Sequence, residues 1–72
     1  MERRTTDDLI RIAIAGGGFV LDAGPRPTED LIRISIAVKG KGRLTFRGMA
    51  ARTTDDLIRI AIAGGGHVTF EG

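Results

Sequence analysis

The sequence predicts an α/β fold in which three tandem helix–strand repeats form a short parallel sheet with the helices on one face. The first observation is a repeat: residues 4–18 read RTTDDLIRIAIAGGG, residues 52–66 are identical, and residues 26–37 (RPTEDLIRISIA) are a related copy. The second is that each copy leads through a glycine-rich joint into a short segment of alternating apolar and polar residues. Successive helix–strand units favour parallel strands joined by right-handed crossovers.

The first half of each unit is predicted to be a helix of about ten residues. Threonine followed by two acidic residues is typical of a helix start, because a hydroxyl accepts a free backbone N–H and acids in the first turn suit the helix dipole. The expected N-caps are Thr6, Thr28 and Thr54. The expected ion pairs within the helices are Asp7–Arg11, Glu29–Arg33 and Asp55–Arg59. The glycine joint then ends the helix.

A second interpretation of the same half is a β-strand. Ile10, Ile12 and Ile14 recur with period two, as strand residues do, and the other copies repeat this pattern. The glycine joint would then be a hairpin turn, and three β-hairpins would form a small all-β barrel. The helix-start signals and the alanines between the isoleucines favour the helix.

The second half of each unit is predicted to be a strand. In the second and third units one face carries the apolar residues, which are Leu44, Phe46, Val68 and Phe70. Val20 lies 24 residues before Leu44, the interval that also separates Leu44 from Val68. This alignment places Phe19 and Leu21 on the outer, otherwise polar face of the sheet.

The whole chain is one small domain, 1–72, with repeats at 4–24, 26–48 and 52–72. A domain of this size buries only about 60% of the surface of its unfolded chain, so a lone monomer has little stability. Disulfides are excluded by the absence of cysteine, which leaves oligomerisation as the usual remedy. We therefore expect a homo-oligomer, a dimer, with Phe19 and Leu21 buried against a second copy or with the sheet edges paired.

The order and layering of these units resemble those of a small leucine-rich-repeat-like solenoid. The resemblance covers the whole chain, but the asparagine ladder and the L-x-x-L-x-L spacing of that family are missing. It therefore implies an architecture and no residue roles. Copies this similar are typical of a recently duplicated, consensus-built or designed sequence.

The residues that carry chemistry do not form a catalytic pattern. Glycine triplets at 16–18 and 64–66 follow their helices, whereas a phosphate loop precedes one. The paired acids recur in every unit, which indicates helix capping. His67 has no partner for a triad, since Ser35 occupies a small-residue position of the repeat. The sequence predicts no enzyme, metal site or cofactor, and the predicted function is a structural or interaction module that self-associates.

Weak nucleic-acid or polyanion binding is the alternative function. It would use the basic residues Lys39, Lys41, Arg43 and Arg47, with Arg26 and Arg52 nearby. The chain has no tyrosine or tryptophan on which bases could stack. Its eleven basic and nine acidic residues alternate, giving a net charge of +2. No apolar run is long enough for a membrane span and no secretory signal is recognisable, so a cytoplasmic location is expected.

Overall fold

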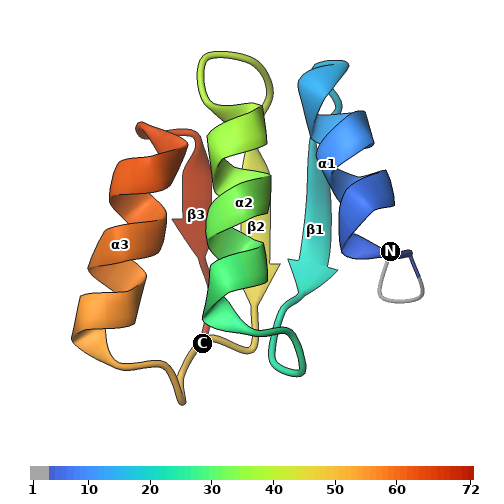
Figure 1. Cartoon of the computed structure of the whole chain (residues 1–72). Coiled ribbons are helices and arrows are strands. Elements are labelled where there is room, and N and C mark those ends of the chain that lie inside the picture. Colours follow the sequence, from blue (N-terminus) through green and yellow to red (C-terminus); the bar gives the residue numbers. More distant parts are fainter. Residues whose placement is uncertain (1–3) are drawn as a thin grey trace.

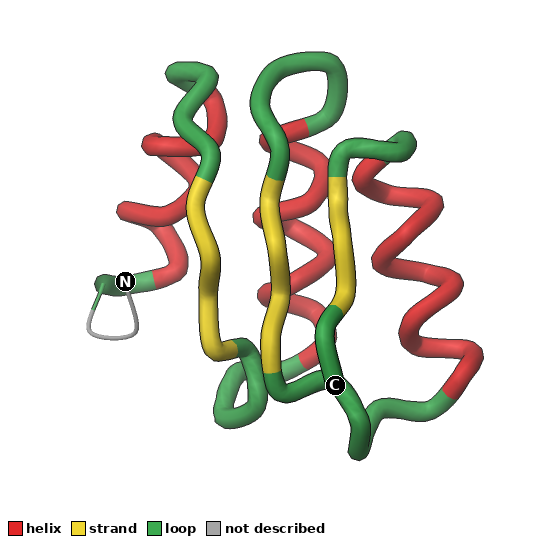
Figure 2. Tube along the Cα trace, turned by 180° about the vertical axis from the view of Figure 1, so that it is seen from behind, coloured by secondary structure: helices red, strands yellow, loops and turns green. Residues whose placement is uncertain are grey.

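The computed structural model describes residues 4–72. Its elements are α1 (Thr6–Ile14), β1 (Phe19–Asp22), α2 (Thr28–Val38), β2 (Leu44–Arg47), α3 (Thr54–Gly64) and β3 (Val68–Phe70). The strands form a parallel sheet in the order β1-β2-β3. The helices lie side by side on one face of the sheet (Figure 1), and the view from behind shows that no helix covers the other face (Figure 2). The predicted α/β fold is confirmed, and the alternative of three β-hairpins is wrong.

Each helix begins one residue earlier than the sequence predicts. The expected N-caps were incorrect, because the first helical residues are Thr6, Thr28 and Thr54. Thr5 and Thr53 cap α1 and α3, and their hydroxyls accept the N–H of Asp8 at 3.1 Å and of Asp56 at 3.2 Å. The N-cap of α2 is Pro27, which has no side-chain hydrogen bond. The hydroxyls of Thr6, Thr28 and Thr54 are therefore not used as N-caps and are available for other partners.

The glycine joints end the helices as expected. The clearest case is Gly65, the C-cap of α3, which adopts the left-handed conformation at φ 58° and ψ 35°. An L-residue rarely adopts this conformation, so glycine is the favoured residue here. The chain then reverses within two residues and starts β3. The longest helices contain 11 residues, and no helix in the described part of the chain is long and apolar enough to cross a bilayer.

Strand β1 pairs in a register that differs from the predicted one. Phe19 lies opposite Leu44, and Leu21 lies opposite Phe46, an interval of 25 residues. A shift of one residue exchanges the two faces of a strand. Leu21 is therefore fully buried and Phe19 half-buried, whereas Val20 is 52% exposed on the outer face. The predicted exposure of Phe19 and Leu21 was incorrect, because burying these two large side chains removes more apolar surface from water than burying Val20 alone.

The core lies between the helices and the inner face of the sheet. The second unit supplies its centre, where Phe46 is the largest fully buried side chain. The buried apolar residues of that unit are Leu31, Ile34, Val38, Leu44 and Phe46. The third unit contributes Ile60 alone to the buried apolar core of the described residues, and its Val68 and Phe70 remain half-buried. The core is thus least complete on the side of the third unit.

Candidate self-association surface

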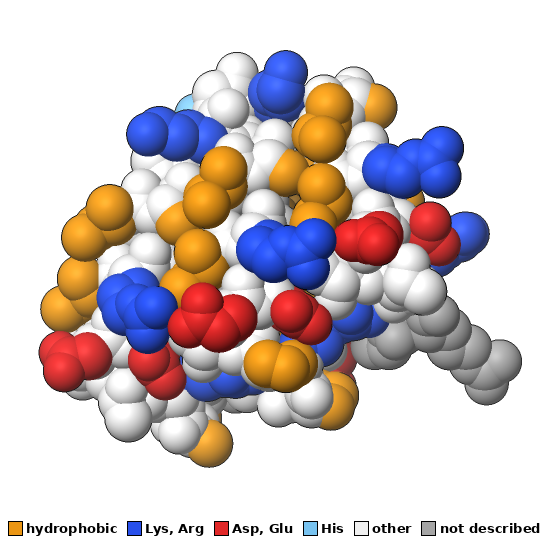
Figure 3. Space-filling view, viewed as in Figure 1, with side chains coloured by type: hydrophobic (Ala, Val, Ile, Leu, Met, Phe, Trp, Pro, Cys, Tyr) orange, Lys and Arg blue, Asp and Glu red, His pale blue; other side chains and the backbone are white. Residues whose placement is uncertain are grey.

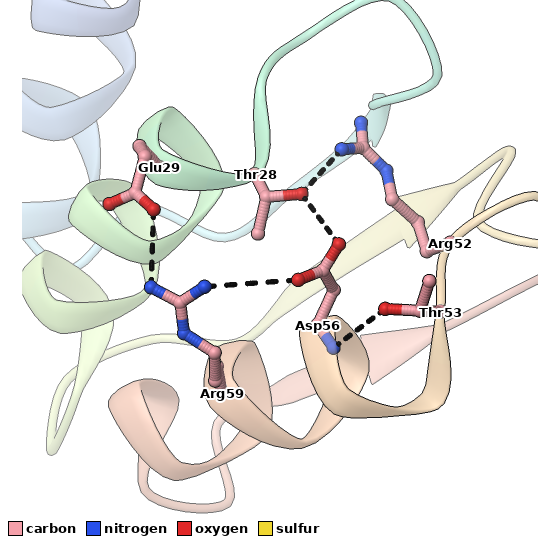
Figure 4. A network of polar contacts seen from close by, with 6 residues as sticks. All are labelled: Thr28, Glu29, Arg52, Thr53, Asp56 and Arg59. Atoms are coloured by element: carbon pink, nitrogen blue, oxygen red, sulfur yellow. Dashed lines mark hydrogen bonds and ion pairs between the residues drawn. The ribbon is translucent and has the colours of Figure 1, made fainter.

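A polar network joins each unit to the next. The hydroxyl of Thr28 donates to Asp56 Oδ2 at 3.3 Å and accepts from Arg52 Nη1 at 2.8 Å. Both partners lie in the next unit, and Figure 4 shows them converging on the first turn of α2. The same arrangement joins the first unit to the second through Thr6, Arg26 and Asp30. Thr6 and Thr28, the first helical residues of α1 and α2, therefore connect their units to the next one.

Ion pairs also run between neighbouring helices. Arg33 pairs with Asp7 at 3.2 Å, and Arg59 pairs with Glu29 at 3.1 Å (Figure 4). The expected pairs within one helix at spacing i,i+4 were incorrect. The acid in the first turn of one helix lies within reach of the arginine of the next helix. Arg59 also lies 3.8 Å from Asp56 of its own helix, at spacing i,i+3. At both junctions inside the chain, the earlier helix thus supplies an acid and the later helix an arginine.

The side of α3 that faces away from α2 has no such neighbour among the described residues. We call it the C-terminal flank and define it by Thr54, Asp55, Ile58 and Ala61. All four side chains are exposed, and Ile58 is 51% exposed. Ile62, which is 71% exposed, borders the groove between α2 and α3. Figure 3 shows hydrophobic side chains gathered along this outer side of α3. The C-terminal flank is therefore an apolar surface with a hydroxyl and an acid beside it.

The opposite side of the molecule, beside α1, has complementary chemistry. A shallow hollow of about 370 Å³ lies on the side of α1 that faces away from α2. We call this surface the N-terminal flank, and its lining residues are Arg4, Asp8, Arg11, Ile12 and Ala15. Within residues 4–72 neither Arg4 nor Arg11 has an ion pair. The N-terminal flank therefore combines two arginines and an aspartate with two apolar residues, Ile12 and Ala15.

The sheet is open at both edges. β2 pairs with a strand on each side, whereas β1 and β3 each have one strand neighbour in the part of the chain that the structure describes. Unpaired backbone groups along a sheet edge can accept a further strand. The free edge of β1 lies beside the N-terminal flank, and the free edge of β3 lies beside the C-terminal flank (Figure 1).

The structure brings together three of the four residues predicted to bind polyanions. Lys39, Lys41 and Arg43 are exposed in the segment that joins α2 to β2. Arg47 lies at the opposite end of β2, where its Nε is 3.4 Å from Glu71 Oε1. The guanidinium groups of Arg26 and Arg52 hydrogen-bond to threonines in the first turns of α1 and α2. The candidate basic cluster is therefore limited to Lys39, Lys41 and Arg43.

The remaining polar groups are dispersed. A wide hollow of about 770 Å³ on the outer face of the sheet is bordered by Asp22, Arg47 and Glu71. His67 is half-buried immediately before β3, with Nδ1 2.9 Å from the carbonyl oxygen of Gly42, and is not the exposed strand residue that the sequence predicts. Residues 4–72 contain no group of three acidic, histidine or cysteine side chains that could hold a metal ion.

Sequence reasoning missed both flanks, although a signal for them was present. Corresponding arginines and acids in successive units have matching positions, and such a pattern fits contacts between units as well as contacts within a helix. Comparison with protein-family models, curated proteins and solved structures gave no significant match.

Proposed function

We propose that this chain is a non-catalytic α/β repeat module, similar in layering to leucine-rich-repeat solenoids, whose function is to associate with copies of itself. The observation that carries the proposal is the incomplete burial of the third unit. Ile58 is 51% exposed in the unit whose strand β3 forms an edge of the sheet, whereas its equivalents Ile10 and Ile32 are half-buried. Contiguous exposed apolar surface next to an unpaired sheet edge is typical of a protein-interaction site.

The engagement of the acidic residues supports a structural role. Asp56 accepts the hydroxyl of Thr28, and its own backbone N–H donates to the side chain of Thr53. Asp30 accepts the hydroxyl of Thr6 in the same way. Acids that join one unit to the next are occupied in holding the fold, which leaves them poorly placed to act as a general acid or base.

Self-association is expected to appear in a dilution series of the unmodified chain. The average mass from multi-angle light scattering should exceed the 7.7 kDa of one chain at high concentration and should fall towards it on dilution. The physical reason is that association removes the apolar flank and the sheet edge from water. A folded monomer at every concentration, with helical far-UV circular dichroism, would contradict the proposal.

Weak polyanion binding is a second candidate function, and the exposed cluster of Lys39, Lys41 and Arg43 favours it. None of the three has an ion pair within the described residues. Replacing all three by glutamine is expected to abolish salt-sensitive retention on heparin, because each lost cation reduces the number of counterions released on binding. The matched control is a triple variant in which glutamine replaces Arg33, Arg47 and Arg59. It removes the same three positive charges from positions outside the basic cluster. Equal loss of retention in both triple variants would show that net charge alone is responsible.

A further inference from the structure

We propose that copies of this chain associate head to tail, with the C-terminal flank of one copy bound to the N-terminal flank of the next. The inference deepens the proposed function and rests on it. It names the occupant of both flanks as a second copy of the chain. Each junction would repeat the contacts that already join consecutive units inside one copy.

Equivalent residues of α2 and α3 differ in how far they are buried. Thr28 and Ile32 in α2 are half-buried and Ser35 is fully buried, because α3 packs beside them. Their equivalents on the C-terminal flank, Thr54, Ile58 and Ala61, are all exposed. The same positions in α1, which α2 covers, are again half-buried or buried: Thr6, Ile10 and Ala13. Thr54, Ile58 and Ala61 thus occupy positions that the fold covers, wholly or in part, wherever another unit follows.

The N-terminal flank shows the converse pattern. Arg4 and Ala15 are exposed, whereas their equivalents in the later units are half-buried, namely Arg26, Arg52, Ala37 and Ala63. Ile12 is half-buried, whereas Ile34 and Ile60 are fully buried. These positions are covered in each unit that has another unit before it. The N-terminal flank is therefore shaped to receive the side of a preceding helix.

The polar groups on the two flanks match in the way that neighbouring units match. Inside the chain an arginine of α3 pairs with an acid of α2, Arg59 with Glu29 at 3.1 Å. The equivalent groups across the proposed junction are Arg11 of one copy and Asp55 of the other. Similarly, the hydroxyl of Thr54 would donate to Asp8 and accept from Arg4, as Thr28 does with Asp56 and Arg52. The side-chain partners of Thr54 and Asp55 are thus present on the opposite flank.

The sheet can continue across the same junction. β1, β2 and β3 are parallel and consecutive, so the free edges of β3 and β1 are the two different edges that a parallel extension needs. Repeating the register of β2 and β3 would place Phe19 of one copy beside Val68 of the other, and Leu21 beside Phe70. All four side chains face the inner side of the sheet. The half-buried Val68 and Phe70 would then be covered on both sides, as Leu44 and Phe46 are.

Such an interface is heterologous, because it joins two different surfaces. A twofold dimer uses the same surface on both copies and stops at two, whereas a heterologous contact leaves one free flank at each end. Head-to-tail association therefore predicts growth beyond a dimer with rising concentration, into an open array or a closed ring. It also predicts that blocking one flank leaves the other able to bind.

Sedimentation velocity on two flank variants tests the inference. Ile58→Asp blocks the C-terminal flank, and Ala15→Arg blocks the N-terminal flank; both residues are exposed. Each variant alone should associate at least about tenfold more weakly than the unmodified chain, because every junction lacks one intact surface. An equimolar mixture should form a dimer and nothing larger, since only one junction per pair combines two intact flanks. The matched control is Ile14→Asp. The side chain of Ile14 is 54% exposed and belongs to neither flank, so this variant should associate as strongly as the unmodified chain.

Each outcome decides a different point. If the unmodified chain associates and both flank variants associate equally well, head-to-tail docking is wrong while the proposed function stands. If the mixture stays monomeric while the unmodified chain associates, the intact N-terminal and C-terminal flanks do not bind each other and the inference is overturned. If the unmodified chain is a monomer throughout, the proposed function fails as well. If either variant loses its helical circular dichroism, the exposed charge variants Arg11→Glu and Asp55→Arg replace the two. Each charge variant alone should associate more weakly than the unmodified chain. Mixing the two should restore association, because the exchanged charges again have opposite signs across the junction.

Discussion

Replacing Phe46 by alanine is expected to lower the free energy of unfolding by about 3 to 5 kcal/mol. Phe46 is fully buried at the centre of the sheet, with β1 and β3 on its two sides and the helices above it. The substitution removes a large apolar side chain and leaves a cavity that a parallel sheet held on both sides cannot close. Small domains have total stabilities of about 5 to 15 kcal/mol, so most of the stability of this chain should be lost.

The matched control for this change is Phe70→Ala. Phe70 lies directly beside Phe46 in β3 and faces the same side of the sheet, but it is only half-buried. Its replacement should cost about 1 to 2 kcal/mol at low protein concentration, because part of its surface already contacts water. Urea unfolding followed by far-UV circular dichroism measures both changes. Equal losses for the two variants would mean that the centre of the core does not lie at β2.

Replacing Arg52 by methionine is expected to cost about 2 to 3 kcal/mol. The guanidinium of Arg52 donates to the carbonyl oxygens of Ala23 at 2.8 Å and of Arg26, in the segment between β1 and α2, and to the hydroxyl of Thr28 at 2.8 Å. Methionine keeps most of the apolar stem and removes all the donors. The half-buried carbonyl groups would lose charged hydrogen-bond partners, which is more costly than losing an exposed contact.

Arg59→Met is the control that separates this effect from the loss of a positive charge. Arg59 pairs with Glu29 at 3.1 Å and lies 3.8 Å from Asp56 in its own helix, but the side chains of Arg59 and Glu29 are more than half exposed. Exposed ion pairs contribute about 0 to 1 kcal/mol, and added salt weakens them further. The loss caused by Arg52→Met should persist in 0.5 M salt, a concentration at which Arg59→Met should have almost no effect. If the two losses are similar in urea unfolding, the hydrogen bonds of Arg52 to the β1–α2 segment do not stabilise the fold.

The helix–strand order could be predicted from sequence because its signals are local. Threonine followed by two acids identified the start of each helix to within one residue, and the glycine joints identified the ends. The one-residue error at the N-caps has a physical reason. Thr5 and Thr6 both suit a helix start, and Thr6 hydrogen-bonds to Arg26 and Asp30 of the next unit, a contact that the local sequence does not indicate.

The register of β1 and the ion pairs could not be predicted in the same way. Spacing alone aligned Val20 with Leu44, whereas the packed sheet aligns Phe19 with Leu44, since two large side chains then enter the core. The arginine and acid positions fitted pairs within a helix as well as pairs between helices. The choice between them depends on how closely α1, α2 and α3 lie together, which is a property of the packed fold. The flanks of the molecule were missed for the same reason.

The central position of the second unit has a consequence for the order in which the chain comes apart. β2 is hydrogen-bonded on both sides and α2 is flanked by α1 and α3, so the middle unit shares an interface with each of the others. If either outer unit opens, β2 stays paired with the remaining outer strand. If the middle unit opens, β1 and β3 both lose their strand neighbour. Local opening therefore begins at the two ends, and the segment 28–47 is the last to lose protection. The segment expected to be protected longest thus lies in the one copy whose sequence departs from the other two.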